Sequence, residues 1–356
     1  MKSWDVIIAG GGIVGISLAR ELRRHGASVL IIERGEPGHE ASYAAAGMLA
    51  YCDPMLLEPL KRLAQASASM YPEFVHEIED ESGMRVDLRA EGTIVCFGQP
   101  AEAVASCVPV GQWRRLGGDE IARLEPQLAY SGEAAYWTPE GSVDPRALVV
   151  ASVKAAKHRG IDFVSGSAVS TVEVENGRTV AVRTSKARYA AGVVVNCCGA
   201  WAGQVGPLHF PTRPIKGQML CVVAAQHGLI NHVVRSPEVY VVPRSDGRIL
   251  IGSTLEDAGF DKRVDPETIQ RLHQAASIVI PDIGEARMLE TWAGLRPGTP
   301  DALPLLGATE IRNYFVATGH YRDGILLAPV TALLMSQLLR GCQPDFDLSA
   351  FSPARF

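Results

Sequence analysis

A short apolar run near the N-terminus passes directly into a glycine-rich turn, and this junction restricts the possible folds more than any other stretch of the chain. The run WDVIIA (residues 4–9) predicts a buried parallel strand, and Gly10, Gly12 and Gly15 follow it with G-x-G-x-x-G spacing. Apolar positions at helical spacing predict a helix over residues 13–25 that stops at the next glycine, and ASVLIIERG predicts a second strand. Strand, glycine turn, helix and strand in this order make a βαβ unit.

The three glycines would have different roles in a dinucleotide-binding turn. Gly10 permits the tight turn, Gly12 lets the backbone approach a pyrophosphate, and Gly15 lets the helix pack closely on the strand. The N-terminus of the helix adds unpaired N–H groups and a partial positive charge. Glu33 follows Gly15 by 18 positions, where a carboxylate can accept hydrogen bonds from ribose hydroxyls. A glycine-rich turn without a ligand is the alternative, and the motif alone does not choose between FAD and NAD.

The composition is that of a globular protein with about two domains. Hydrophobic residues make up 47% and charged residues 21% of the 356 residues. The net charge of -5 and the pI near 6.0 do not point to a nucleic acid or an anionic membrane as a partner. No apolar run reaches the roughly 18 residues of a membrane span, and no leader pattern precedes the first strand, so we expect a cytoplasmic protein. Seven cysteines without C-x-x-C spacing argue against a disulfide framework or a metal site. We also expect a homo-oligomer.

The pattern of elements predicts an α/β fold in which two domains interleave along the chain. Residues 1–84, 141–208 and 290–356 are expected to form a Rossmann-type nucleotide-binding domain. Residues 85–140 and 209–289 are expected to form a substrate domain. That domain should contain a mostly antiparallel sheet, because short β-branched runs such as QMLCVV, VYVVP and RILIGS are separated by turn residues.

Two further segments favour a flavin. The run ASYAAAGMLA (residues 41–50) has small side chains that suit a backbone lying against a flat ring, although an ordinary alanine-rich helix is the alternative. Near the other end of the chain, GHYRDG (residues 319–324) joins a predicted strand to the final apolar helix. Its backbone N–H groups and the helix dipole can face the oxygen of a reduced flavin. A cofactor held by both ends of the chain is typical of FAD.

Five motifs together resemble the glycine oxidase/D-amino-acid oxidase family of flavoenzymes: GGGIVG, AAAGMLA, YVVPRSDGRILIGST, WAGLRPGTPDALPLLG and GHYRDGILLAP. The resemblance covers nearly the whole chain and implies a two-domain fold with FAD as cofactor. It implies FAD contacts among the following residues, which include the fingerprint positions: Gly10, Gly12, Ile13, Val14, Gly15, Glu33, Arg34, Ala41, Ser42, Ala46, Gly47, Met48, Val169, His320, Tyr321, Arg322, Asp323, Gly324, Ile325 and Leu326. Cys52, Cys96 and Cys342 match no flavin-attachment motif, so we expect FAD to be bound noncovalently.

Arg296 stands in the middle of the Gly/Pro-rich motif WAGLRPGTPDALPLLG, with Asp301 as the one carboxylate near it in sequence. An arginine keeps its charge, so a buried one needs an anion, which is a structural partner such as Asp301, a cofactor phosphate or the substrate. The resemblance implies that Arg296 holds the substrate carboxylate through two N–H bonds, that Tyr240 adds a hydroxyl bond, and that Arg322 lies near the substrate. Tyr240 as a cap on a backbone carbonyl, and Arg322 as a partner of the flavin or the helix end, are the alternatives. His320 is expected to pack or hydrogen-bond beside the flavin rather than act as a base.

The reaction that the resemblance implies is the oxidation of glycine or a small D-amino acid. Hydride passes from the α-carbon to flavin N5, water hydrolyses the imine, and O2 reoxidises the flavin to give hydrogen peroxide, without a side-chain base. The pathway suggested is the supply of imine for the thiazole of thiamine. Leu255 and Glu238 depart from the family pattern and leave the preferred substrate open. The alternatives are a flavin dehydrogenase that passes electrons to a quinone or a partner subunit, and a flavin-binding protein without turnover.

Overall fold

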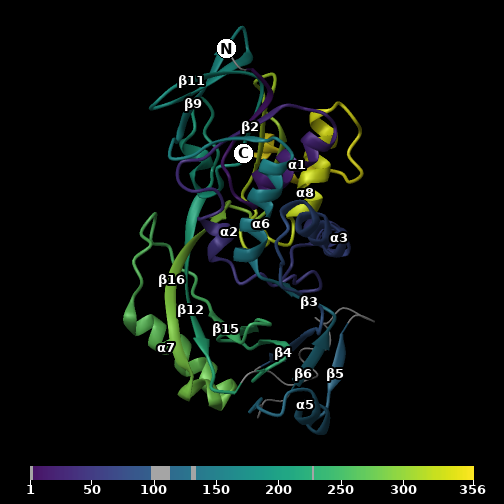
Figure 1. Cartoon of the computed structure of the whole chain (residues 1–356), viewed down its shortest axis with the longest axis vertical. Coiled ribbons are helices and arrows are strands. Elements are labelled where there is room, and N and C mark those ends of the chain that lie inside the picture. Colours follow the sequence, from purple (N-terminus) through teal and green to yellow (C-terminus); the bar gives the residue numbers. More distant parts are fainter. Residues whose placement is uncertain (1–2, 98–112, 130–133, 227) are drawn as a thin grey trace.

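Two large sheets lie one above the other along the long axis of the molecule (Figure 1). The computed structural model describes residues 3–97, 113–129, 134–226 and 228–356. In Figure 1 the upper part holds the first sheet with the helices α1, α3, α6 and α8, and the lower part holds most of the second sheet with α5 and α7. The chain therefore has the interleaved α/β architecture that the sequence predicts.

The first sheet is built on parallel strands. The pairs β1–β2, β1–β11, β2–β8 and β11–β18 are all parallel. In sheet order the strands are β17 (Leu305–Ala308), β18 (Tyr314–Thr318), β11 (Arg188–Asn196), β1 (Trp4–Ala9), β2 (Val29–Ile32) and β8 (Asp162–Val164). An antiparallel hairpin of β9 (Val169–Glu175) and β10 (Arg178–Thr184) extends from β11. Its turn places Asn176 and Gly177 at positive φ, as a two-residue hairpin turn requires.

Both faces of this sheet are buried, which explains why its strands read as continuous apolar runs. Val6 and Ile8 of β1 point into a core shared with the helices, whereas Ile7 and Ala9 point into a second core on the opposite face. The helices of the first core are α1 (Ile13–Arg24), α3 (Glu58–Ser82), α6 (Pro145–His158) and α8 (Ala328–Leu339). They pack on one another as α1–α8, α1–α6, α3–α6 and α3–α8.

The second sheet is antiparallel except where β13 runs parallel to β4. Its order is β16 (Arg287–Gly298), β12 (Arg213–Val223), β15 (Arg248–Gly252), β14 (Tyr240–Pro243), β13 (Val233–Arg235), β4 (Thr93–Phe97), β6 (Ala134–Thr138) and β5 (Arg114–Leu116). The helices α5 (Gly118–Leu124) and α7 (Pro266–Val279) pack on it around a third core. The remaining short elements are α2 (Ala41–Ala44), β3 (Leu88–Arg89), β7 (Ser142–Val143) and the 3-10 turns Gly199–Gln204, Pro281–Glu285, Ser349–Phe351 and Pro353–Arg355.

One predicted boundary differs from the structure. Residues 290–298 were expected in the nucleotide-binding domain, but they belong to β16, which pairs with β12 from Arg213 to Val223. The partner strand lies about 75 residues away in sequence, so no local pattern could assign the strand to its sheet. In Figure 1 the long strands β12 and β16 run from the lower part up to the first sheet, and they join the two halves of the molecule.

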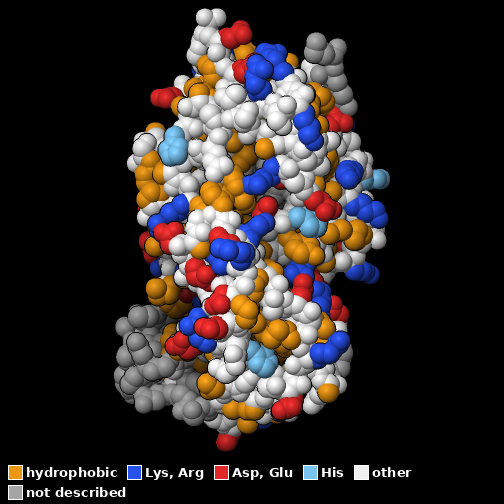
Figure 2. All heavy atoms as spheres, turned by 90° about the vertical axis from the view of Figure 1, so that its left-hand side faces the viewer, with side chains coloured by type: hydrophobic (Ala, Val, Ile, Leu, Met, Phe, Trp, Pro, Cys, Tyr) orange, Lys and Arg blue, Asp and Glu red, His pale blue; other side chains and the backbone are white. Residues whose placement is uncertain are grey.

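The helices and one face of the surface can be compared with what a membrane span or a uniformly charged surface would show. Within the described ranges, no helix combines the length and the apolarity that crossing a bilayer requires. On the face drawn in Figure 2, basic and acidic side chains lie intermingled with hydrophobic ones rather than in one large area of a single sign.

Candidate functional site

A cavity of about 940 Å³ lies between the two sheets and brings together most of the residues singled out from the sequence. Its walls come from the carboxyl ends of the parallel strands and from one face of the antiparallel sheet. Open α/β sheets bind ligands at those strand ends. The predicted residues that line the cavity are Gly10, Gly12, Ile13, Val14, Glu33, Arg34, Ala41, Ser42, Ala46, Gly47, Met48, Val169, Tyr240, Arg296, His320, Tyr321, Arg322, Asp323, Gly324 and Ile325. Gly15 and Leu326 lie outside its lining.

The glycines of the fingerprint differ in their surroundings as the sequence predicts. Gly10 has φ +105°, and a Cβ there would be 2.6 Å from the carbonyl carbon of Cys197. A Cβ on Gly15 would overlap the carbonyl of Gly10 and reach 3.2 Å from a methyl of Ile8, so Gly15 serves the packing of α1 on β1. A Cβ on Gly12 would meet only the Ser42 hydroxyl, at 3.4 Å. The backbone at Gly12 is therefore open to the cavity, as the approach of a pyrophosphate needs.

The first turn of α1 also fits an anion. No carboxylate lies in this turn, and the N-cap residue Gly12 has no side chain to accept from its N–H groups. The hydroxyl of Ser42 accepts a hydrogen bond of 3.0 Å from the N–H of Ile13. The partial positive charge of the helix end and its remaining N–H donors therefore face the cavity. No acidic side chain in this first turn neutralises the charge or accepts from the donors, so both are left for a bound anion.

Glu33 directly follows β2, and two backbone N–H groups hold its carboxylate in place. The side chain is 7% exposed, and its two oxygens accept hydrogen bonds from the N–H groups of Gly11 (2.7 Å) and Gly35 (2.9 Å). Each carboxylate oxygen has a second lone pair that can accept from a hydroxyl. Beside it, the Arg34 guanidinium lies 4.3 Å from the centre of the Trp201 ring. The donor and acceptor set at this end of the cavity therefore fits a dinucleotide.

The alanine-rich run forms a wall rather than a long helix. Only residues 41–44 are helical, and the chain continues in an irregular path past Gly47, which has φ +77°. A Cβ on Gly47 would be 2.9 Å from Cδ of Pro145 and would overlap the carbonyl of Val143. The N–H of Val143 in turn donates to the carbonyl of Gly47 at 2.8 Å. The alternative of an ordinary helix through this segment was therefore wrong, because close backbone packing against β7 sets its path.

Arg296 has no acidic partner among the described residues. Its Nη2 donates to the Ser253 hydroxyl at 2.6 Å and its Nη1 to the Thr254 carbonyl at 3.0 Å. Asp301 instead accepts two hydrogen bonds from Arg355, at 2.8 and 3.1 Å. A guanidinium has five N–H donors, so donors remain for an anion in the cavity. The structural pairing of Arg296 with Asp301, left open by the sequence, does not occur.

Tyr240 lies in the same wall as Arg296. It pairs with Gly252 across β14 and β15, and its ring lies over that glycine, where a Cβ would be 2.8 Å from Cζ of the tyrosine. Its hydroxyl lies 3.6 Å from Sδ of Met219 and caps no backbone carbonyl in the described part of the chain. The hydroxyl therefore faces the cavity with its hydrogen-bonding capacity largely unused.

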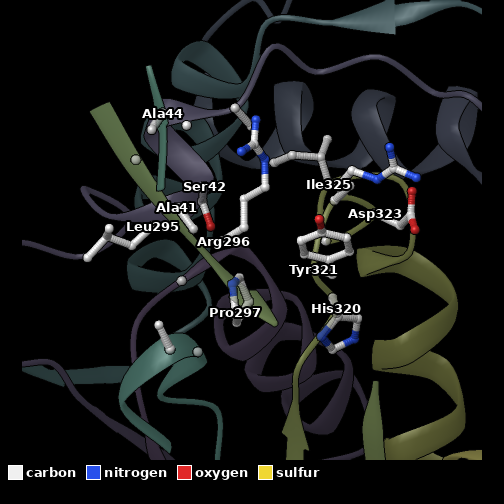
Figure 3. Close-up of a pocket in the computed structure, with 18 of the residues that line it drawn as sticks. Ala41, Ser42, Ala44, Leu295, Arg296, Pro297, His320, Tyr321, Asp323 and Ile325 are labelled. Carbon is white, nitrogen blue, oxygen red and sulfur yellow. The ribbon is translucent and has the colours of Figure 1, made fainter. Parts of the chain in front are cut away.

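The loop between β18 and α8 forms the opposite wall (Figure 3). This loop is longer than predicted, because α8 begins at Ala328 rather than directly after Gly324. Buried side chains of α3 hold it, since the hydroxyls of Tyr71 and Ser67 donate to the carbonyls of Ile325 and Leu326, both at 2.6 Å. Leu326 itself points into the helix core.

His320 in this loop is not a cation at neutral pH. It is 4% exposed, its Nε2 lies 3.1 Å from the Thr331 hydroxyl, and burial lowers its pKa to about 4. The next residue, Tyr321, adopts φ +48°, and the guanidinium of Arg322 lies 5.5 Å from the centre of its ring. These positions agree with His320 as a packing and hydrogen-bonding residue.

The cysteines near the cavity are not activated as nucleophiles. Burial raises the pKa of the Cys52 thiol to about 11, and its Sγ lies 3.4 Å from the Thr138 hydroxyl. Cys197 and Cys198 follow the last residue of β11 instead of lying inside the strand, and burial raises the pKa of Cys198 to about 12. Cys107 lies outside the described residues.

The polar and aromatic lining residues that sequence reasoning missed include Asp53, Arg235 and Trp201. Arg235 is directly opposite Tyr240 in the β13–β14 pair, so both side chains lie on the same face of the sheet. The spacing of VVRSPEVYVVP could have indicated this pairing. Asp53 has no comparable local signal, because Arg235, with which its carboxylate forms an ion pair, lies 182 residues away in sequence.

Comparisons with known proteins agree with this geometry. Residues 5–338 match the family model DAO, described as FAD dependent oxidoreductase. The chain is 36% identical to the bifunctional protein ThiO/ThiG of Trichormus variabilis, over 99% of this chain and 55% of that protein, so it spans about half the length of that relative. It is 34% identical to the glycine oxidase of Geobacillus kaustophilus, over 99% of this chain and 97% of that one. The crystal structure of the Geobacillus kaustophilus glycine oxidase superposes with a TM-score of 0.94 at 33% identity, over the full length of both chains.

Proposed function

Because this chain belongs to the DAO family of FAD-dependent oxidoreductases, with FAD as its cofactor, we propose that it oxidises glycine or another small amino acid at the carbon that carries the amine. The observation that carries this proposal is the Arg296 guanidinium, which faces the cavity and whose hydrogen-bond partners among the described residues, Ser253 and Thr254, are neutral. A small amino acid brings the carboxylate that this cation lacks. The glycine oxidases among the relatives support the same substrate class.

Arg296 and Tyr240 hold the substrate by its acid end. The guanidinium forms charge-assisted hydrogen bonds to the carboxylate, and the tyrosine hydroxyl adds another from the adjacent strand. Ser253 and Thr254 orient the guanidinium from behind, and Gly217 leaves room for it. Holding one end of the substrate limits the directions in which its Cα–H bond can point, and orientation of this kind supplies much of the catalysis in such a reaction.

The cofactor end of the cavity holds FAD through the first turn of α1, through Glu33 and through the loop before α8. FAD, when bound, accepts the hydride from the substrate carbon, so the protein itself needs no metal or nucleophile for that step. Water then hydrolyses the imine to a 2-oxo acid and ammonia. With O2 as the final acceptor the second product is hydrogen peroxide, and we propose a cytoplasmic homo-oligomer as the working form.

The test is anaerobic mixing of the yellow holoprotein with glycine, sarcosine, D-alanine, D-proline and their L-counterparts. We expect at least one of the glycine and D-series compounds to bleach the visible absorption of the oxidised flavin. Admission of air should then restore the absorption and release one equivalent of hydrogen peroxide. A flavin that is bleached but stays reduced in air until a quinone is added would identify the dehydrogenase alternative. A flavin that no amino acid bleaches would contradict the proposed function.

A further inference from the structure

A cluster of aromatic and charged side chains outside the cavity joins α2 to the strand that carries Arg296. We call it the Arg146 cluster, and it consists of Tyr43 on α2, Arg146 on α6, and Glu290 and Trp292 on β16. None of these four residues lines the cavity. The cluster therefore acts on the cavity only through the elements that it holds together.

Arg146 is the residue through which the cluster connects its elements. Its guanidinium carbon lies 4.4 Å from the centre of the Tyr43 ring and 4.5 Å from the centre of the Trp292 ring. A guanidinium over an aromatic face is attracted by the negative charge of that face. Its Nη1 forms an ion pair with Glu290, and its Nε donates to the Tyr43 carbonyl at 3.4 Å. One side chain of α6 therefore contacts both α2 and β16.

The backbone of Arg146 is itself fixed. It lies in the first turn of α6, where the N-cap Asp144 accepts hydrogen bonds from the N–H groups of Arg146 (2.9 Å) and Ala147 (3.2 Å). Such a cap holds the first turn of a helix in one geometry. The Arg146 side chain is only 16% exposed, so water competes little for its contacts.

α2 and β16 also touch each other directly. Nε1 of Trp292 donates to the Ala44 carbonyl at 3.0 Å, and a Cβ on Gly294 would overlap Cβ of Ala44. Figure 3 shows Ala44 beside the strand that carries Arg296. Because alternate residues of a strand lie on the same face, Trp292, Gly294 and Arg296 share one face of β16. The contact with α2 is therefore made by the face that presents Arg296.

The two elements serve different ligands in the proposed function. α2 belongs to the FAD side, because Ser42 lines the cavity and accepts a hydrogen bond from the first turn of α1. Arg296 on β16, Tyr240 on β14 and Ser253 directly after β15 all belong to the second sheet or its loops. A small movement of this sheet relative to α2 would therefore shift the carboxylate-binding residues together, without separating them from one another.

We propose that the Arg146 cluster positions the substrate-binding residues relative to the flavin, with Arg146 and Trp292 as positioning residues. The inference rests on the proposed function, in which the substrate carbon is oxidised beside the flavin. Such a reaction depends steeply on the distance and direction between the reacting atoms, and a shift of about 1 Å can slow it about 100-fold. By tying α2 to β16, the cluster fixes that distance from outside the cavity.

Trp292→Phe in the holoprotein tests the assignment. It keeps an aromatic ring for Arg146 and removes the N–H that binds the Ala44 carbonyl. The rate constant of anaerobic flavin reduction, measured at saturation with the amino acid that best reduces the wild type, should fall about tenfold. Acetate has no amine to be oxidised, so its binding can be measured by titration calorimetry. Its dissociation constant should stay within about threefold of the wild-type value, because Arg296 and Tyr240 keep their arrangement.

Arg146→Gln weakens the same contact from α6. It removes the cation that lies over both rings and pairs with Glu290, and it should reproduce the slower reduction with unchanged acetate binding. The double variant with Trp292→Phe should be little slower than the slower single variant, because residues that act as one unit are not additive. FAD content and unfolding temperature are measured on each protein.

Trp137→Phe is the matched control. Trp137 also lies in the second sheet, on β6, and its Nε1 donates to the Glu91 carbonyl at 3.2 Å. The guanidinium carbon of Arg114 lies 5.7 Å from the centre of its ring. Trp137 does not line the cavity and makes no contact of this kind with α2, so its substitution should leave both the reduction rate constant and acetate binding unchanged.

The outcomes of these measurements are distinct. If Trp292→Phe and Arg146→Gln reduce their flavin as fast as Trp137→Phe does, the cluster does not position the site. If acetate binding weakens as much as reduction slows, the substitutions have disturbed Arg296 within its own sheet, and the proposal is equally wrong. If Trp292→Phe cannot hold FAD, Arg146→Gln decides by the same two measurements. A wild-type holoprotein that no amino acid reduces contradicts the proposed function itself, whereas normal reduction in the variants contradicts only the role of the cluster.

Discussion

A single methyl group at Gly217 would test how Arg296 works. Gly217 lies in β12 opposite Gly294, and the Arg296 guanidinium lies over it. A Cβ at position 217 would be 2.6 Å from Cζ of Arg296, whereas ordinary contacts begin at 3.4 Å. The end of an arginine side chain is flexible and the strand backbone is not. Gly217→Ala should therefore displace the guanidinium by about 1 Å and leave the sheet intact.

The expected loss of activity follows from that displacement. Moving a substrate-positioning group by about 1 Å can slow a reaction about 100-fold, which corresponds to about 2.7 kcal/mol of lost transition-state stabilisation. The hydrogen bonds of Arg296 to Ser253 and Thr254 would lengthen with the same movement. The stability of the fold should change by only about 1 kcal/mol, because the alanine also restricts the unfolded chain.

The assay is anaerobic rapid mixing with the amino acid that best reduces the wild-type flavin. We expect the reduction rate constant divided by the dissociation constant to fall about 100-fold in Gly217→Ala, with FAD content and unfolding temperature close to those of the wild type. Gly192→Ala is the matched control, since Gly192 also lies in a strand, β11, and a Cβ there would be at an ordinary 3.5 Å from the carbonyl of Asp5. A Gly217→Ala protein that reduces its flavin as fast as the Gly192→Ala protein would refute the role given to Arg296.

Three other predictions test separate parts of the cavity. Tyr240→Phe removes a hydrogen bond to a charged group and should lower the same kinetic ratio at least about tenfold, whereas an unchanged ratio would place the hydroxyl away from the substrate. Gly12→Ala adds a methyl in the open space above the turn and should release FAD during ultrafiltration, and full retention would argue against close approach of the pyrophosphate. His320 has a folded-state pKa of about 4 against an ordinary value of 6.5, so the unfolded state binds its proton first as the pH falls. Its contribution to stability is therefore present above pH 6.5 and is lost progressively down to pH 4, by up to about 3 kcal/mol. Denaturant titrations of His320→Gln should lack that part of the acid destabilisation, and an unchanged pH dependence would exclude it.

The nucleotide end of the site could be predicted almost completely from the sequence. The turn at Gly10 and Gly12, the helix after it and the carboxylate at Glu33 follow one another within one βαβ unit, so local spacing determines how they meet. The loop at residues 319–324 could be recognised as a motif, but its true length could not. Its end depends on Tyr71 and Ser67 of α3, which hold carbonyls more than 250 residues away.

The substrate end depended much more on the tertiary structure. Arg296 and Tyr240 were identified by their motifs, yet nothing near Arg296 in sequence excluded Asp301 as its partner. That question was decided by Arg355, which pairs with Asp301, and by Ser253 and Thr254 in the loop after β15, which accept hydrogen bonds from the guanidinium. The ion pairs of Arg235 with Asp53 and Glu140 had no sequence signal, because the three residues are brought together from separate strands and loops.

The sequence by itself determined the elements, the fingerprint turn and the kinds of side chain available for chemistry, because hydrophobic periodicity and turn residues act over a few neighbours. Only the tertiary structure decided which charges meet across the cavity and which stay unpaired. Strand β16 belongs to the second sheet because it pairs with β12. Pairing between strands that lie far apart in sequence depends on how the whole chain packs, not on the residues of either strand alone.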